Sequence, residues 1–240
     1  MLKSKLLKIY TQEMYFPTLL SLFINPFYFG RKGLYKNIKD LASNITGKTL
    51  DVGCGLKPYQ KLYHSSEYIG LEYDTPENRE SKNADYFYDG TTFPFEKSSF
   101  DSVVVNEVFE HVFNPNNFLQ QINEVLKKDG ILFMTMPFAW DEHEQPFDYA
   151  RYTSFGISSI LKKHGFEIIT QRKSVSDIRV IFQQLNLYIF KKLRTRNGFL
   201  NQIIILFLIS PFNILGEILN LILPNNPDLY LDNIVLARKV

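Results

Sequence analysis

From Thr46 onward, short apolar segments alternate with segments of helical periodicity, and this alternation most restricts the fold. The apolar segments are TLDV, YIGLE, YFYD, SVVVN, GILFMTM and FEIIT. Between the fourth and fifth of them, apolar side chains recur on one helical face, at Phe118, Leu119, Ile122, Val125 and Leu126. Strands that alternate with helices need crossover connections, which produce a mostly parallel sheet. We therefore predict an α/β fold.

Local signals place several boundaries of these elements. Asp129-Gly130 is expected to end the helix of residues 118–126 in a left-handed turn. Thr153 is expected to cap a further helix that runs to His164, with Gly165 at its end. The segment LYLDNIVLARK, which follows two prolines, is typical of one more strand.

Composition and charge restrict the class of protein. The chain has 240 residues, of which 45% are hydrophobic and 22% charged, as in an ordinary globular protein. Its single cysteine, Cys54, excludes an internal disulfide and indicates a reducing compartment. The net charge is +5 over residues 1–40, −6 over residues 41–190 and +3 over residues 191–240. This pattern argues against nucleic-acid binding and makes the two basic, apolar ends candidates for contact with an anionic surface.

These features divide the chain into four parts. We expect an N-terminal helical cap over residues 1–45, a core over 46–175, an apolar helical insert over 176–226, and a final strand of the core over 227–240. The N-terminal segment is apolar and aromatic after its first lysines, but Glu13 and Pro17 interrupt it and no small-residue cleavage site follows. We therefore do not interpret it as a signal peptide.

The apolar insert has three interpretations. A spanning helix is disfavoured by polar residues and a proline within residues 199–223, namely Asn201, Gln202, Ser210, Pro211 and Asn213. A helical hairpin in a membrane interface fits better, with the basic cluster 191–196 facing anionic headgroups. An insert packed against the domain or against a second copy in a homodimer fits equally well. The basic, aromatic N-terminus favours membrane contact slightly, through residues 1–36 and 191–223.

The strongest local signal is Asp51-Val52-Gly53-Cys54-Gly55, followed by Pro58. A strand ends here, the glycines turn the chain tightly, and a helix is expected to begin near the proline. Glu72 ends the next strand, where doubly wound folds place an acid against ribose hydroxyls. A nicotinamide cofactor would use the same acid, but the dinucleotide pattern needs a third glycine where this chain has Pro58.

These residues and three later motifs form a resemblance. The later motifs are Asp89-Gly90-Thr91-Thr92-Phe93-Pro94-Phe95, Ser99-Phe100-Asp101-Ser102-Val103-Val104 and Val108-Phe109-Glu110-His111-Val112. In this order, over residues 46–172, the chain resembles class I S-adenosylmethionine-dependent methyltransferases of the type 11, small-molecule branch. The resemblance implies a Rossmann-like, doubly wound, mostly parallel seven-stranded sheet with helices on both faces and an antiparallel last strand.

The resemblance also implies how S-adenosylmethionine is bound, with S-adenosylhomocysteine as product. Asp51, Gly53 and Gly55 would line the methionine end, and Glu72 would take the ribose hydroxyls. Asp89, beside Gly90, would accept the adenine amino group, although it could instead shape its own loop. Asn106 would lie beside the sulfonium. One departure is Lys57, where the family often has glycine, so a cation is expected near the cofactor loop.

The loop of residues 137–153 follows the fifth strand, at the sheet edge where open α/β folds bind ligands. If the acceptor is a hydroxyl, a base must take its proton. His143 is the first candidate, with Glu144, Asp148 or His111 serving or orienting it. His111 could equally be a structural histidine. The residues predicted to contact substrate are Trp140, Asp148, Arg151 and Tyr152. The alternative is a surface cover held by an Asp148–Arg151 pair. A metal on His143, Glu144 and Asp148 lacks zinc-like spacing, so no metal is predicted.

These observations lead to one prediction of function and two rivals. We predict a cytoplasmic S-adenosylmethionine-dependent methyltransferase, peripheral on the inner face of the membrane if the ends bind lipid. Its acceptor would be a small or lipid-linked molecule such as a quinone precursor or a cell-surface sugar intermediate, and its target a hydroxyl. The rivals are a NAD-dependent oxidoreductase and a catalytically silent, membrane-associated binding module of the same fold.

Overall fold

The computed structural model describes residues 2–240 of the chain, with side chains from Leu7 onward. It divides into two compact units, which we call the helical unit and the sheet unit. The helical unit comprises the chain up to Asn37, together with Ala139–Asp141 and Lys173–Asp232. The sheet unit comprises Ile38–Phe138, Glu142–Arg172 and Asn233–Val240. Met1 and the side chains of residues 2–6, part of the predicted membrane-contact segment 1–36, lie outside the described residues.

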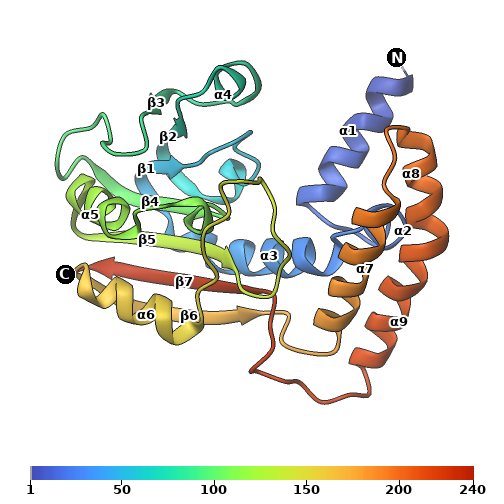
Figure 1. The fold of residues 1–240 in the computed structure, drawn as a ribbon. Helices are drawn as coiled ribbons and strands as arrows, with labels where there is room; N and C mark the ends of the chain where they lie inside the picture. Colours follow the sequence, from blue (N-terminus) through green and yellow to red (C-terminus); the bar gives the residue numbers. More distant parts are fainter. Residues whose placement is uncertain (1) are drawn as a thin grey trace. The chain divides into compact units, whose positions relative to one another are not determined.

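The sheet has seven strands in the order β3-β2-β1-β4-β5-β7-β6 (Figure 1). Their bounds are β1 Thr46–Val52, β2 His64–Tyr73, β3 Tyr86–Tyr88, β4 Phe100–Asn106, β5 Leu126–Pro137, β6 Phe166–Ser174 and β7 Asp232–Lys239. The pairs β1–β2, β1–β4, β2–β3 and β4–β5 are parallel, and β7 runs antiparallel to its neighbour β6 at the other end of the sheet (Figure 1). The predicted α/β class and Rossmann-like, seven-stranded sheet are therefore confirmed. The strand order reverses between β1 and β4, the point at which such sheets bind ligands.

The helices of the sheet unit complete its core. They are α4 (Pro76–Ser81), α5 (Pro115–Val125) and α6 (Ser154–Lys163), with short 3₁₀ turns η1 (Ala42–Asn44), η2 (Gln60–Leu62) and η3 (Phe109–His111). The predicted apolar face of α5 is buried, at Phe118, Leu119, Ile122 and Val125. It packs in one cluster with β1 and β4 residues such as Leu50 and Val103, both with no exposed surface. Thr153 caps α6 by accepting the Gly156 N–H, as expected.

Two local expectations are wrong. No α-helix follows the glycine loop: only η2 lies between Gly55 and the start of β2 at His64, a stretch too short for a crossover helix. The left-handed residue Asp129, with φ of 61°, does not end α5. That helix stops at Val125, β5 begins at Leu126, and Asp129 instead bends the first part of the strand.

The helical unit contains most of the chain's exposed apolar surface. Its helices are α1 (Leu2–Tyr15), α2 (Ser21–Ile24), α3 (Tyr28–Leu41, whose last turn belongs to the sheet unit), α7 (Arg179–Leu193), α8 (Gly198–Ile204) and α9 (Ser210–Asn220). A π-helical turn, η4 (Ile205–Ile209), joins α8 to α9. These three segments form one continuous helix of 23 residues, so the expected helical hairpin is wrong. Pro211 is tolerated because it lies in the first turn of α9, next to the irregular π turn.

The polar residues of this helix point into the helical unit. Ser210, Asn213 and Gly216 are buried, and α9 packs on α7 and α2. The Asn213 side chain donates to the carbonyl of Leu22 at 3.0 Å and accepts from the Asn186 amide at 2.8 Å. Of the residues expected to resist lipid, Ser210 and Asn213 are therefore buried in protein, whereas Asn201 and Gln202 are half-buried and Pro211 is exposed.

Candidate active site

The glycine loop after β1 has backbone conformations that favour glycine. Gly53 has φ of 70° and Gly55 has φ of 51°. A Cβ atom at Gly53 would lie 2.3 Å from Val108 Cγ2, whereas a Cβ at Gly55 would meet nothing within 4 Å. The two glycines thus have different roles: Gly53 allows close packing against the loop after β4, and the backbone at Gly55 borders open space.

Glu72 holds this loop in place from the end of β2. Its Oε2 accepts the backbone N–H of Gly55 at 3.0 Å, and its Oε1 accepts the N–H of Tyr73 at 3.1 Å. The side chain is buried among protein on one side and lines a cavity on the other. The sheet edge therefore brings the predicted ribose-binding acid to the glycine loop.

Asp51 is buried at the end of β1 and accepts the Tyr68 hydroxyl at 2.7 Å. Burial raises the pKa of its carboxyl to about 7 even though the Tyr68 hydrogen bond opposes the shift, and the charge of Glu72 adds to the rise. Asp51 is not among the described residues that line the cavity. It lies behind the glycine loop and carries a charge that changes near neutral pH.

Lys57 has the backbone conformation that glycine would adopt, with φ of 52°. Its ammonium pairs with Asp85 Oδ2 at 2.5 Å, and the side chain is only 7% exposed. Gly70 on β2 makes room for it, because a Cβ there would lie 2.4 Å from Lys57 Cε. The cation expected near the cofactor loop is thus directed onto a carboxylate.

A cavity of about 750 Å³ opens at the carboxyl ends of β1, β2 and β4. That volume lies within the range of roughly 300–1,000 Å³ found for ligand sites. Six of the predicted residues line it: Gly53, Glu72, Asp89, Gly90, His111 and Glu144. Other lining residues were not predicted from the sequence, including Tyr73, Asn78, Glu107, Val108, Phe113 and Phe147. Their positions in the sequence could have indicated them, because each lies at or shortly after a strand end or in the loop after β5.

Two further predicted cofactor residues have contrasting environments. Asp89 Oδ1 accepts the N–H groups of Thr91 and Thr92 at 2.8 and 3.1 Å and the Thr91 hydroxyl at 2.7 Å, and these bonds lower its pKa. Asp89 thus shapes its own loop while lining the cavity. Asn106 donates to the Tyr63 hydroxyl at 3.3 Å, but its buried Oδ1 has no hydrogen-bond partner among the described residues. A buried polar atom without a partner commonly indicates a ligand or water.

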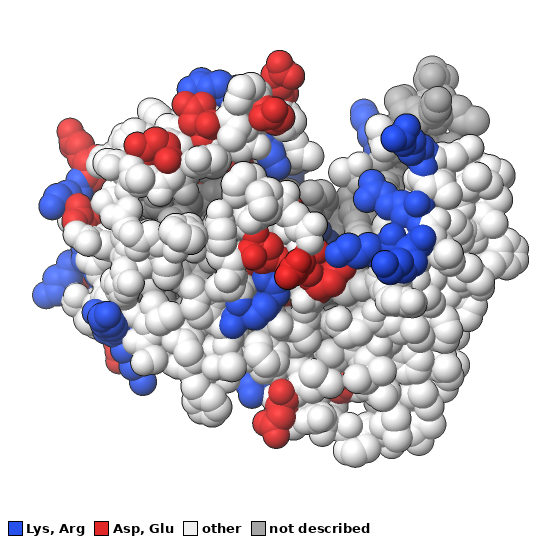
Figure 2. All heavy atoms as spheres, viewed as in Figure 1, with Lys and Arg blue, Asp and Glu red and all other residues white. Residues whose placement is uncertain are grey.

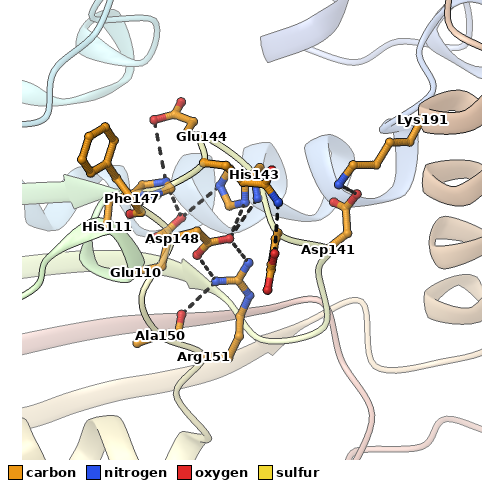
Figure 3. Close-up of polar contacts among 12 residues, drawn as sticks. Glu110, His111, Asp141, His143, Glu144, Phe147, Asp148, Ala150, Arg151 and Lys191 are labelled. Carbon is orange, nitrogen blue, oxygen red and sulfur yellow. Dashed lines mark hydrogen bonds and ion pairs between the residues drawn. The ribbon is translucent and has the colours of Figure 1, made fainter.

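The loop after β5 is tied to the turn after β4 (Figure 3). The backbone N–H groups of Tyr149 and Ala150 donate to the Glu110 carbonyl at 2.9 and 3.2 Å. His111 Nδ1 lies 2.9 Å from the Phe147 carbonyl, and its Nε2 lies 3.9 Å from Glu144 Oε2. The fold therefore places two predicted catalytic residues, His111 and Glu144, together on the cavity wall.

His143, Asp148 and Arg151 form a second group in the same loop (Figure 3). Asp148 Oδ2 accepts the His143 N–H at 3.0 Å and lies 3.2 Å from His143 Nδ1. Arg151 donates to both Asp148 oxygens, at 2.5 and 2.6 Å. Burial would raise the pKa of Asp148, but the bonds from Arg151 and from the His143 backbone outweigh it and lower the pKa to about 2. The alternative pairing of Asp148 with Arg151 is thus present, and it also orients His143.

The remaining predicted substrate residues have structural contacts. Trp140 belongs to the helical unit, where its ring packs 3.0 Å from the position of a Cβ on Gly30 and 6.0 Å from the Phe27 ring centroid. Tyr152 packs on Phe109, with ring centroids 5.0 Å apart, and its carbonyl accepts from Asn233 at 2.7 Å. Neither is brought beside His111 by a described contact.

The residues present fit S-adenosylmethionine. The backbone at Gly55 borders open space, Glu72 offers a carboxylate beside it, and the cavity continues to Asp89. The unpartnered Asn106 Oδ1 is a further polar atom suited to a ligand.

Comparison with protein families identifies a methyltransferase domain over residues 50–134. This stretch runs from the end of β1 into β5 and contains all four motifs of the resemblance. A comparison with curated proteins found no match.

Several solved structures share the fold. The cyclase SpnF is 18% identical, with a TM-score of 0.56 over 88% of this chain and 82% of that one. An S-adenosylmethionine-dependent methyltransferase from Mesorhizobium loti is 12% identical, with a TM-score of 0.55 over 86% and 98%. Phosphoethanolamine N-methyltransferase 2 from Haemonchus contortus, solved with S-adenosyl-L-methionine, is 18% identical, with a TM-score of 0.54 over 95% and 59%.

At these identities the structures show the fold, which by itself names no reaction. The reaction and the methyl donor come from the family match, which favours S-adenosylmethionine over the nicotinamide alternative. Together the motifs, the sheet and the family match show that this chain contains a methyltransferase domain in a Rossmann-like fold, with S-adenosylmethionine as the methyl donor.

Proposed function

We propose that the enzyme transfers a methyl group to a hydroxyl oxygen of a small or lipid-linked acceptor. The observation that supports this most is the position of His111 and Glu144, which line the same cavity as Gly53 and Glu72. A hydroxyl is a weak nucleophile and gains from a nearby proton acceptor. Thiolate or amine acceptors need that help less.

The cofactor lies along the glycine loop in this proposal. Asp51, Gly53 and Gly55 surround its methionine end, Glu72 takes the ribose hydroxyls and Asp89 takes the adenine amino group. Asn106 lies near the sulfonium. When bound, S-adenosylmethionine supplies an electrophilic methyl group, so the protein's main task is to align acceptor and methyl.

His111 is the proton acceptor that the geometry favours. The Phe147 carbonyl lies 2.9 Å from Nδ1, and a carbonyl can only accept. In the neutral imidazole the proton therefore resides on Nδ1, which leaves Nε2 able to accept one. His143, the first candidate from the sequence, is oriented by Asp148 and acts together with His111, whose ring centroid lies 4.8 Å away.

The mouth of the cavity suits an apolar or aromatic acceptor. Phe113 is 81% exposed and Phe147 is 59% exposed, and both line the cavity. Tyr149 packs against Phe113 with ring centroids 5.1 Å apart. Exposed aromatic side chains grouped at a pocket are typical of binding surfaces.

We also propose peripheral membrane contact through the helical unit. The helix Gly198–Asn220 has a mean hydropathy of 1.9 and is long and apolar enough to cross a membrane, a weak indication in itself. Only 28% of that apolar window is buried, and Phe199, Phe207 and Leu221 are more than two-thirds exposed. Figure 2 shows an uncharged surface over α8 and α9. The exposed Lys192 lies in the last turn of α7, and the exposed Arg194 and Arg196 follow that helix. An apolar face beside basic residues is typical of binding at an anionic interface.

The test is a transfer assay with isotopically labelled S-adenosylmethionine. Phenols, catechols and polyprenol-linked sugars are offered together with amine and thiol analogues, and products are followed by mass spectrometry. We expect label on an oxygen, a rate reduced by His111→Gln, and no effect of His64→Gln, which changes an exposed histidine on β2.

Transfer to the amine analogue alone would contradict the hydroxyl proposal. Thermal unfolding with S-adenosylhomocysteine, beside NAD as control, tests the cofactor separately. A ligand at about 100 times its Kd stabilises a protein by about 2.7 kcal/mol. Stabilisation by S-adenosylhomocysteine without turnover of any acceptor would favour the catalytically silent binding module.

A further inference from the structure

Glu110 is a buried carboxylate with no hydrogen bond to compensate its burial. The residue lies in η3 and has no exposed surface. Neither Oε1 nor Oε2 has a hydrogen-bond partner among the described residues. Burying a carboxylate without hydrogen bonds is costly, and natural structures avoid it unless a counter-ion or a metal is present. The positive charge of Arg151 acts on it, since Glu110 helps to raise the pKa of that guanidinium, but no described group donates a hydrogen bond to the Glu110 carboxylate. The side chain therefore calls for a closer cationic partner.

Two imidazoles lie around this carboxylate (Figure 3). His111 Nε2 and His143 Nε2 each lie 3.7 Å from Glu110 Oε1. The three potential ligand atoms are all within 4.8 Å of one another. Glu110 and His111 come from the turn after β4, whereas His143 comes from the loop after β5. The tertiary structure thus assembles one carboxylate and two imidazoles from separate segments.

Both imidazoles are oriented by their other ring nitrogen. His111 Nδ1 lies 2.9 Å from the Phe147 carbonyl, and His143 Nδ1 lies 3.2 Å from the Asp148 carboxylate. Asp148 is itself fixed by the two bonds from Arg151. Metal-binding histidines almost always have such a carbonyl or carboxylate behind them, because it holds the proton on one nitrogen and directs the other at the ion.

The separations fit a small divalent ion after minor adjustment. Two nitrogen or oxygen ligands at 2.0–2.1 Å from a tetrahedral ion are roughly 3.4 Å apart. The two distances of 3.7 Å to Glu110 Oε1 are a few tenths of an ångström longer, and the third separation, between the two imidazole nitrogens, is at most 4.8 Å, so the two rings must also approach each other. Side-chain torsions of the glutamate and the histidines can close that difference without movement of the backbone.

We propose that Glu110, His111 and His143 bind a divalent transition-metal ion of the zinc class. Two imidazoles and one carboxylate are a ligand set typical of zinc and other first-row ions, whereas magnesium prefers oxygen ligands alone. Of the three ligands, His111 lines the cavity, as does the neighbouring Glu144, so an open coordination position on that side would lie toward the space of the acceptor. A site with three protein ligands and one open position is the arrangement of catalytic zinc.

The role of the ion rests on the proposed function. The acceptor hydroxyl binds at the open position, where the ion lowers the pKa of its proton. That proton passes to the Glu144 carboxylate. The acceptor oxygen then forms a bond to the methyl carbon, and the carbon–sulfur bond breaks with its electron pair on sulfur, which gives an ether and S-adenosylhomocysteine. His111 serves as a ligand in this case, and Glu144 takes the proton in its place.

The experiment measures metal binding directly on the full chain, without any acceptor. Purified protein is stripped with a chelator and titrated with Co²⁺, whose visible absorption reports nitrogen ligation and low coordination number, and then with Zn²⁺ by calorimetry. We expect one equivalent of each ion, with Zn²⁺ displacing the Co²⁺ spectrum. Glu110→Gln, His111→Gln and His143→Gln should each weaken Zn²⁺ binding at least tenfold, whereas His64→Gln should not.

Glu110→Gln also controls for folding, because it keeps the shape of the side chain and removes the buried charge. Its circular dichroism spectrum and metal-free Tm should match or exceed those of the wild type. A lower metal-free Tm, together with no cobalt spectrum in the wild type, would overturn the proposal and indicate an ion pair between Glu110 and a protonated histidine. Metal binding that survives all three substitutions would overturn it as well. Because neither readout uses methyl transfer, failure of the hydroxyl proposal leaves this test unaffected.

Discussion

Glu72 accepts a hydrogen bond from the backbone N–H of Gly55, 3.0 Å away, across the carboxyl ends of β2 and β1. The bond connects the acid expected to bind ribose with the loop expected to border the methionine end. A carboxylate that is already held in position loses little freedom when a ligand binds. The glycine loop and the acid therefore act as one preformed element of the cofactor site.

Glu72→Gln should weaken S-adenosylhomocysteine binding by about 10- to 100-fold, because a hydrogen bond to a charged group contributes about 1.5–3 kcal/mol. The glutamine can still accept the Gly55 N–H, so the fold should be retained. Calorimetric titration measures the affinity. Glu67→Gln, at an exposed position of the same strand, is the matched control. Equal affinities for the two variants would remove Glu72 from the cofactor site.

Gly53→Ala should be far more damaging than Gly55→Ala. Both positions have positive φ, which costs an alanine roughly 1–2 kcal/mol. Only at Gly53 does the new methyl also collide with Val108, 2.3 Å away. Chemical denaturation of both variants measures the difference. Similar losses of stability would show that the loop moves away from Val108 in solution.

Cofactor affinity should rise with pH around neutrality. Burial raises the pKa of Asp51 to about 7, so the folded protein binds a proton there that the unfolded chain has released. Wild-type stability, relative to Asp51→Asn, should therefore fall as pH increases from about 4 to 7. If Asp51 attracts the ammonium of the cofactor, S-adenosylhomocysteine should bind more tightly above pH 7. Titrations between pH 5.5 and 8.5 check this, and an affinity independent of pH would contradict it.

Asp148→Asn should destabilise the protein at neutral pH. Its pKa of about 2 in the folded state reflects the bonds from Arg151 and from the His143 backbone. At about 1.4 kcal/mol per pKa unit, the charged form contributes about 2 kcal/mol. That contribution is present above pH 4 and is lost as the pH falls toward 2, so the two proteins should converge in acid. Urea unfolding at pH 7 and pH 3 measures this, with Asp129→Asn as an exposed control.

Phe207→Glu should reduce sedimentation with anionic vesicles about tenfold or more, since burying a phenylalanine contributes about 1.5–3 kcal/mol. Phe207 is 67% exposed on the long helix of the helical unit. Phe155→Glu is the control, because Phe155 is 84% exposed on α6 of the sheet unit. Equal binding by both variants would favour the alternative in which the apolar face contacts a second copy of the chain.

The sequence alone was sufficient for the sheet, for the buried face of α5 and for the family. Strand and helix periodicity are local properties that one-sided burial imposes, so Phe118, Leu119, Ile122 and Val125 could be assigned without a structure. The glycine loop and Glu72 were recognisable because a strand end, a tight turn and an acid at the next strand end follow one another along the chain. Two predictions were wrong: a helix was expected after Pro58 but is absent, and a helical hairpin was expected where one continuous helix runs through Pro211. At both places the packing of neighbouring segments outweighs the local sequence signal.

Only the tertiary structure decided which polar residues meet. Glu110 and His111 lie 33 and 32 residues before His143, and no spacing rule joins them. The sheet brings the turn after β4 beside the loop after β5, because β4 and β5 pair in parallel. The pairing of Lys57 with Asp85, 28 residues apart, also depends on the tertiary structure. Sequence periodicity determines which side chains are buried, but the partner of a buried charge depends on strand neighbours far apart in the chain.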